Sequence, residues 1–176
     1  MPKKLKISSD HHSESAPFSE NHEKSLAAKR IFETREEFLE KLINQVKKNL
    51  PKSQANLIIK FARQYYATVA LDDLLSHDVE DLYGALLSHW NLMQHHKANE
   101  VRLRIYNPQF EQHGWQSPHT VIELSQDDMP FLVDSIQMEL NRRELMTHML
   151  VHVGGLKVKR DAKNNIIDIV SPTATD

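Results

Sequence analysis

Two adjacent carboxylates, Asp127 and Asp128, are the residues of this chain best suited to general acid–base chemistry. They lie directly before Met129 and Pro130, where a predicted amphipathic helix over residues 129–143 begins. An acidic side chain in that position is typical of a helix cap, because its oxygens accept hydrogen bonds from the first free backbone N–H groups. We therefore predict that the two aspartates cap the helix and take no catalytic part.

Eleven histidines raise the question of a metal site. His148 and His152 are four residues apart on a predicted strand, which places them on one face but roughly 13 Å apart along it. Two side chains at that separation cannot share a zinc ion, and no HExxH motif is present. His89 and His95 or His96 do not have the i, i+4 spacing that brings two ligands together on a helix, and His11 and His12 lie in the predicted tail. We predict structural roles for all of them.

Nucleophilic and cofactor chemistry find no support in the sequence. Ser117 and Ser135 lack the Gly-x-Ser-x-Gly turn that exposes a nucleophile, and the absence of cysteine excludes disulfides and thiolate chemistry. Neither a GxGxxG fingerprint nor a Walker A loop can be written, because glycine occurs at four positions only: Gly84, Gly114, Gly154 and Gly155. The sequence thus predicts no catalytic, metal-binding or cofactor-binding residue in this chain.

Composition and charge narrow the class of protein. The 176 residues carry a formal net charge of −2 with scattered Lys and Arg, which gives no reason to expect a nucleic-acid partner. No run of about 18 apolar residues occurs, so no membrane span is expected. The basic N-terminus has no apolar segment behind it, as a secretory signal would require. These features predict a cytoplasmic protein.

The first hundred residues are predicted to form a disordered tail and a helical bundle. Residues 1–30 are poor in large apolar groups, which favours disorder. Over residues 31–98 three helices are expected, the first opened by a capping box of Thr34 and Glu37 and the second beginning near Ser53. A short turn over residues 71–75 precedes the third helix, which Asp78 caps. One apolar stripe at helical spacing follows in that helix: Leu82, Leu86, Trp90 and Met93.

The hydrophobic period changes after residue 99. Alternation of apolar and basic residues over 101–105 is typical of a half-buried strand, and 119–125 is predicted as the next strand. The helix over 129–143 follows, then a strand over 149–159 interrupted by a bend at Gly154 and Gly155, a turn, and a strand over 166–170. A sheet with one covering helix leaves a face open. Either a partner meets that face, or the chain is the front piece of something longer, which we favour.

Several strings of the sequence resemble the N-terminal region of the large bacterial NAD-specific glutamate dehydrogenases. The resemblance covers roughly residues 35–172, and the strings that carry it are DVEDLYGA from Asp78, SHW from Ser88, VRLRIYNP from Val101, HGWQSPHT from His113 and DDMPFLVDS from Asp127. It implies a parent enzyme that oxidatively deaminates L-glutamate to 2-oxoglutarate and ammonia with NAD. The dehydrogenase domain of that parent would lie beyond Asp176. The chain would then be a non-catalytic portion for assembly or regulation, and its partners the remainder of the enzyme or other subunits.

The same resemblance implies a fold. That region of the family contains ACT-like modules, and residues 119–170 look like the βαββ portion of one, so we expect an α+β chain: a bundle of about three helices, then an incomplete ACT-like, ferredoxin-like module over residues 99–176. Asp128 and Pro130 match the ligand-binding D-x-P-G-L-L string of ACT domains, but Phe131 replaces its glycine, which favours packing over amino-acid binding. Glu144 likewise stands where a helix-ending glycine is natural and suggests a strained or different exit.

Two alternatives remain open beside the dehydrogenase reading. One is a free-standing amino-acid-sensing module, whose candidate effector-binding residues are Asp127, Asp128, Met129, Pro130 and Phe131. The other is a protein-interaction domain that completes its sheet with a partner through the uncovered face.

Overall fold

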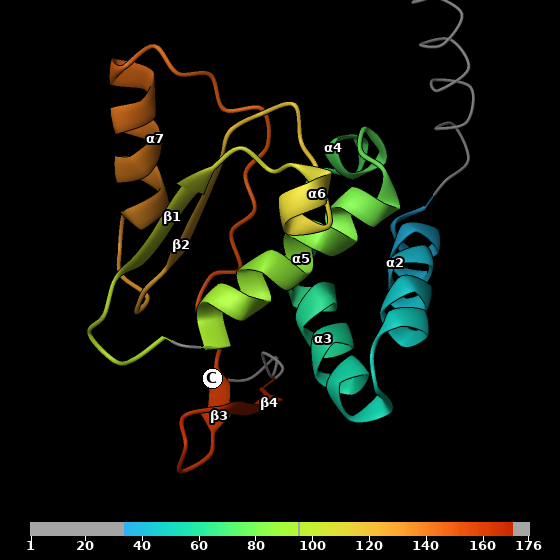
Figure 1. Ribbon diagram of the computed structural model, residues 1–176. Helices are drawn as coiled ribbons and strands as arrows, with labels where there is room; N and C mark the ends of the chain where they lie inside the picture. Colours follow the sequence, from blue (N-terminus) through green and yellow to red (C-terminus); the bar gives the residue numbers. More distant parts are fainter. Residues whose placement is uncertain (1–33, 95, 171–176) are drawn as a thin grey trace, which may run out of the picture. The chain divides into compact units, whose positions relative to one another are not determined.

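The computed structural model describes residues 34–94 and 96–170, and its elements follow the α+β order expected from the sequence (Figure 1). The tail predicted for residues 1–30 lies outside the described residues, as do His11, His12 and His95. In chain order the elements are α2 (Arg35–Asn49), α3 (Lys52–Tyr65), α4 (Leu71–Leu75), α5 (Val79–Gln94), β1 (Arg102–Tyr106), α6 (Phe110–His113), β2 (Val121–Ser125), α7 (Leu132–Arg142), β3 (Val158–Arg160) and β4 (Ile166–Ile169).

Helices α2, α3 and α5 pack on one another around a shared apolar core, which confirms the predicted bundle. The capping box is present: Thr34 Oγ1 accepts from the Glu37 N–H at 3.2 Å, and the Thr34 N–H donates to the Glu37 carboxylate at 2.8 Å. The bundle's most deeply buried side chains come from all three helices and their connections: Phe38, Leu42, Val46, Phe61, Tyr66, Leu74 and Leu86.

The segment over residues 71–75 is a five-residue helix, α4, and the prediction of a plain turn was wrong. Leu74 has no exposed surface, so this short helix is held by the side chain that it inserts into the bundle core. In addition, no helix among the described residues is long and apolar enough to cross a membrane.

Strands β1 and β2 form an antiparallel pair in which Arg104 lies opposite Glu123 and Ile105 opposite Ile122. The alternation of β1 is confirmed, but its apolar residues face outward and its polar residues face the rest of the fold, the reverse of an ordinary half-buried strand. Leu103 and Ile105 are each 59% exposed, whereas Arg104 reaches helix α5. Opposite charges on neighbouring strands satisfy each other, which allows the polar face to pack inward.

Strands β3 and β4 form a second antiparallel pair, separate from the first. The single strand predicted over residues 149–159 was therefore too long: only Val158–Arg160 pairs, because Gly154 and Gly155 both adopt positive φ and bend the chain. Ile166 and Ile169 of β4 are buried in the same core as the helices, so this hairpin packs on the bundle.

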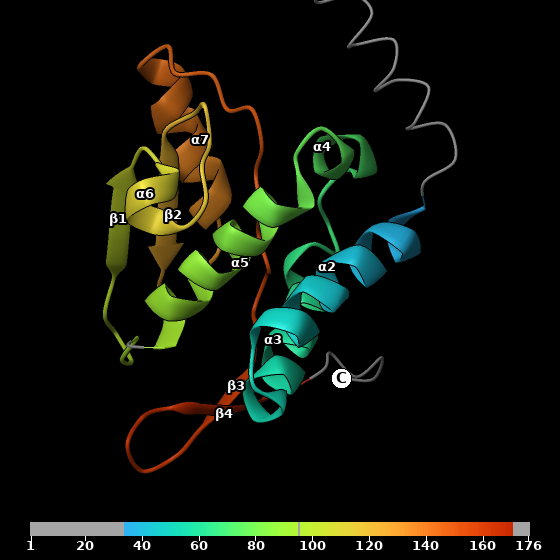
Figure 2. The ribbon, with the colours of Figure 1, turned by 45° about the vertical axis from the view of Figure 1, so that its right-hand side comes forward.

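Helix α7 begins at Leu132, three residues later than predicted, after Phe131 in the left-handed region at φ 62°. It ends in a Schellman arrangement, in which the Leu145 N–H donates to the Leu140 carbonyl at 2.9 Å. Glu144 occupies the left-handed position of that motif at φ 58°, which confirms the strained exit. Both views place α7 beside the β1–β2 hairpin (Figures 1 and 2).

Candidate functional site

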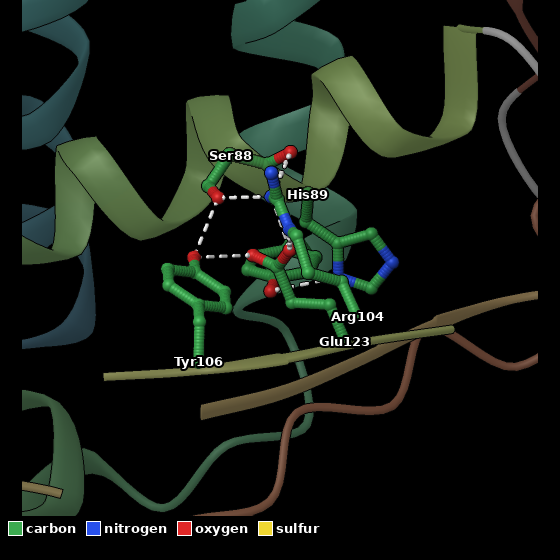
Figure 3. A network of polar contacts seen from close by, with 6 residues as sticks. Ser88, His89, Arg104, Tyr106 and Glu123 are labelled. Atoms are coloured by element: carbon green, nitrogen blue, oxygen red, sulfur yellow. Dashed lines mark hydrogen bonds and ion pairs between the residues drawn. The ribbon is translucent and has the colours of Figure 1, made fainter. Parts of the chain in front are cut away.

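A buried carboxylate, Glu123, forms the centre of a polar network between the β1–β2 hairpin and helix α5 (Figure 3). Its side chain is 5% exposed, and Arg104 from the facing strand neutralises it. Arg104 Nε donates to Glu123 Oε2 at 2.8 Å, and Nη2 contacts the same oxygen. A buried charge is tolerated when it is paired and hydrogen-bonded, as this one is.

The network reaches α5 through Ser88. Arg104 Nη2 donates to the Ser88 hydroxyl at 2.5 Å and approaches its carbonyl oxygen at 3.3 Å. The Tyr106 hydroxyl lies 2.7 Å from the Ser88 hydroxyl and donates to Glu123 Oε1 at 3.2 Å. The Arg104 guanidinium also lies 4.7 Å from the centre of the Tyr106 ring, within the range of a cation–π contact. Hairpin and helix are therefore joined by a closed set of polar contacts.

The next residue of α5, His89, contacts helix α3. Its Nδ1 lies 3.1 Å from the Tyr65 hydroxyl, and the two rings meet edge to face. Burial lowers the pKa of His89, against the opposing influence of Glu123 and of a hydrogen bond with the Leu124 backbone. Burial also raises the pKa of Tyr65. The pair is consequently neutral near pH 7.

This arrangement can hold elements together, but it lacks the features of a reaction centre. The Ser88 hydroxyl contacts the Arg104 cation and the Tyr106 phenol, whereas an activated serine needs a base to take its proton. Glu123 and Arg104 are occupied by their ion pair with each other. The network is a clamp between α5 and the hairpin.

A second contact joins α5 to the segment after α6. Gly84 gives room for Trp115, since a Cβ added at Gly84 would lie 2.2 Å from the Trp115 Cβ. One turn earlier, the Asp81 carboxylate accepts from the Gln116 N–H at 3.1 Å. The strings DVEDLYGA and HGWQSPHT are thus complementary surfaces, and their residues meet in the fold.

The structure corrects the capping role predicted for Asp127 and Asp128. Asp127 accepts from the Asn99 N–H at 2.6 Å and pairs with His96 at 3.2 Å, and no side chain caps α7 at Phe131. These contacts lower the pKa of Asp127, the Asn99 N–H most of all. Asp127 therefore anchors the loop before β1.

The other candidate effector-binding residues line an open surface. Asp128, Met129 and Pro130 are exposed, and a Cβ at Gly155 would lie 3.2 Å from the Asp128 carboxylate. Phe131 is 77% exposed, so the packing role predicted for its ring was wrong. Its backbone adopts a positive φ of 62°, a conformation that glycine adopts without strain.

Among the histidines, the structure brings together a pair that sequence spacing could not reveal. His119 and His148 stack with ring centroids 4.0 Å apart and planes 15° from parallel. Within residues 34–94 and 96–170, no group of three or more His, Cys, Asp or Glu side chains is placed to hold a metal ion.

Comparison with known proteins identifies the family. The model of the glutamate dehydrogenase ACT1 domain matches residues 61–176, which is more than half of the chain. This chain belongs to that family. It is 42% identical over 144 residues to the NAD-specific glutamate dehydrogenase of Halomonas elongata, covering 82% of this chain and 9% of that protein. It is 43% identical over 110 residues to the NAD-specific glutamate dehydrogenase of Pseudomonas aeruginosa, covering 62% and 7%. No solved structure matches.

The matched ACT1 region contains the whole polar network, from Tyr65 to Glu123. Sequence reasoning missed this network because it tested His89 only for metal binding, and predicted a structural role without a partner, and because it considered Arg104 only as the polar half of an alternating strand. One signal was available: neighbouring strands carry Arg104 and Glu123, which can pair across an antiparallel ladder. The chain spans less than a tenth of the length of the two relatives.

Proposed function

We propose that this chain is the ACT1 portion of an NAD-dependent glutamate dehydrogenase and that it serves assembly or regulation. The parent enzyme would oxidatively deaminate L-glutamate to 2-oxoglutarate and ammonia in the cytoplasm, with NAD bound elsewhere in the polypeptide. Family membership and the names of the two relatives support this proposal.

The observation that carries the assembly role is the outward apolar face of the β1–β2 hairpin. Leu103 and Ile105 are each 59% exposed, and Ile122 on the facing strand is 42% exposed. Contiguous apolar surface of this kind marks an interface. Covering these three half-exposed side chains would contribute about 1 kcal/mol each. The occupant that we propose is another segment of the same dehydrogenase, since the matched segment makes up only 9% and 7% of the two relatives.

A lysine scan of the hairpin tests this interface. Ile105→Lys should change the stability of the 176-residue chain by less than about 0.5 kcal/mol, because the side chain is already exposed. In the full-length dehydrogenase the same change should reduce the assembled fraction in size-exclusion chromatography with light scattering. Ile167→Lys is the matched control, since Ile167 is 54% exposed but lies on the other hairpin. Equal losses of assembly from both variants would contradict the proposed interface.

The genome offers an independent test of the parent enzyme. A glycine-rich dinucleotide fingerprint should be encoded downstream in the same reading frame, or in a separate polypeptide that co-purifies with this chain. If neither is found, the dehydrogenase assignment loses its basis, whatever the outcome of the hairpin variants.

Amino-acid sensing at residues 127–131 is a second candidate, favoured by the positive φ that Phe131 adopts in the position of the ACT glycine. Isothermal titration of the chain with a panel of amino acids should then give heat, and Phe131→Gly should tighten binding by removing the benzyl group. Absence of heat at millimolar ligand with both proteins would count against this function.

A further inference from the structure

A polar cleft of about 440 Å³ lies apart from the network and uses none of residues 127–131. Its walls come from the end of α5, the start of β1 and the turn between β3 and β4. The lining residues are Gln94, Lys97, Arg102, Lys163, Asn164 and Asn165.

Hydrogen bonds fix the walls of this cleft. Arg160 donates to the Met93 carbonyl at 2.9 Å, to the Gln94 carbonyl at 3.1 Å and to the Asn164 carbonyl at 2.9 Å, which ties the end of α5 to the β3–β4 turn. The Asn164 amide donates to the His96 carbonyl at 3.1 Å. The cleft is therefore formed before any ligand arrives, and a ligand need not order it.

The side-chain amide of Gln94 provides a hydrogen-bond donor to the cleft. Its side-chain oxygen accepts from the Ile166 N–H at 3.3 Å, so the amide nitrogen of the same group is the atom left to meet a ligand. A ligand that accepts hydrogen bonds fits this lining better than one that donates them.

Three of the six lining residues are cations, and none is a carboxylate. Glu100 pairs with Arg102 of the lining at 3.7 Å and accepts from the Lys97 backbone N–H. Asp161 accepts from the Lys163 and Asn165 backbone N–H groups, each at 2.8 Å. Within the described part of the chain, the Lys97 and Lys163 ammonium groups form no ion pair.

We propose that this cleft binds a small oxyanion carrying more than one negative charge, either a phosphate or a dicarboxylate. The anion would offset the charges of the Lys97 and Lys163 ammonium groups, and Arg102, which pairs with Glu100, adds a third positive group to the lining. This site goes beyond the proposed function, because it requires neither NAD nor the parent enzyme.

Titration of the ¹⁵N-labelled 176-residue chain with inorganic phosphate, and separately with glutarate, tests the site at constant ionic strength. Saturable shifts are expected in the side-chain amide signals of Gln94, Asn164 and Asn165. The double variant Lys97→Gln/Lys163→Gln should weaken binding about tenfold or more. Lys157→Gln/Lys159→Gln is the control, since it removes the same charge from exposed residues outside the lining.

The titrations distinguish binding in the cleft from non-specific screening of surface charge. Saturation with one anion and not the other supports the site and identifies its chemistry. Shifts that rise linearly without saturating, or equal weakening in the two double variants, would mean that the anions merely screen surface charge, and the site would be refuted. A chain that binds neither phosphate nor glutarate would refute it as well.

Discussion

Removing the charge of Glu123 is the most direct perturbation of the clamp between α5 and the hairpin. Glu123→Gln keeps the shape of the side chain but leaves Arg104 without its counter-ion. Breaking a fully buried ion pair costs about 3–5 kcal/mol. Because the Arg104 side chain is 41% exposed, water compensates part of that loss. We therefore expect the free energy of unfolding to fall by about 2 kcal/mol.

Urea denaturation of the 176-residue chain measures this change, and a double-mutant cycle isolates the pair. Glu123→Gln, Arg104→Met and their combination should give a coupling energy of about 1–2 kcal/mol, the range expected of contacting residues. The exposed pair of Glu139 and Arg142 on α7 is the matched control, with nitrogen and oxygen 2.7 Å apart. Its cycle, Glu139→Gln with Arg142→Met, should give no coupling above experimental error.

Equal coupling energies in the two cycles would refute the reasoning, because burial would then have no bearing on the strength of the pair. A further check is the m-value, which should be the same in all variants if the hairpin stays on α5. A lower m-value in Glu123→Gln alone would indicate that the hairpin detaches from α5. The loss of stability would then report the whole contact between hairpin and helix, and not the ion pair alone.

Three further predictions concern two backbone positions, Gly84 and Glu144, and the protonation of His89. Gly84→Ala should destabilise the chain by about 1–3 kcal/mol despite the better helix propensity of alanine, because its Cβ would collide with Trp115; urea denaturation followed by tryptophan fluorescence measures this. Glu144→Gly should stabilise it by about 1 kcal/mol in the same assay, because glycine adopts φ 58° without strain. The lowered pKa of His89 means that the folded state binds fewer protons than the unfolded state. Stability should therefore decrease as pH falls below about 6.5, and His89→Gln should flatten that dependence.

The helices could be predicted from the sequence because their signals are local. Thr34 and Glu37 are three residues apart and form the capping box within one turn. The apolar stripe of α5 was read from spacing alone, and Leu82, Leu86 and Trp90 are all buried. Such signals depend on one turn or one face of a single helix, so they need no knowledge of the partner element.

The orientation of the hairpin could not be predicted, because it depends on a partner distant in the sequence. An alternating strand indicates two faces but does not say which one is buried. Burial of the polar face requires Glu123 opposite Arg104 and Ser88 on the facing helix, and each residue alone looks like a surface residue. The contact of Asp127 could not be predicted for the same reason: its partner, the Asn99 N–H, lies 28 residues earlier.

The polar clamp and the exposed apolar face are two consequences of one orientation. A two-stranded hairpin has little stability by itself, so its position depends on what it packs against. Turning its apolar face onto α5 would separate Arg104 from Ser88 and would leave the Ser88 hydroxyl without its partners. The buried ion pair therefore favours one orientation over the other, which is the role best attested for buried polar groups. By holding the charged face inward, it keeps Leu103, Ile105 and Ile122 exposed for the interface that we propose.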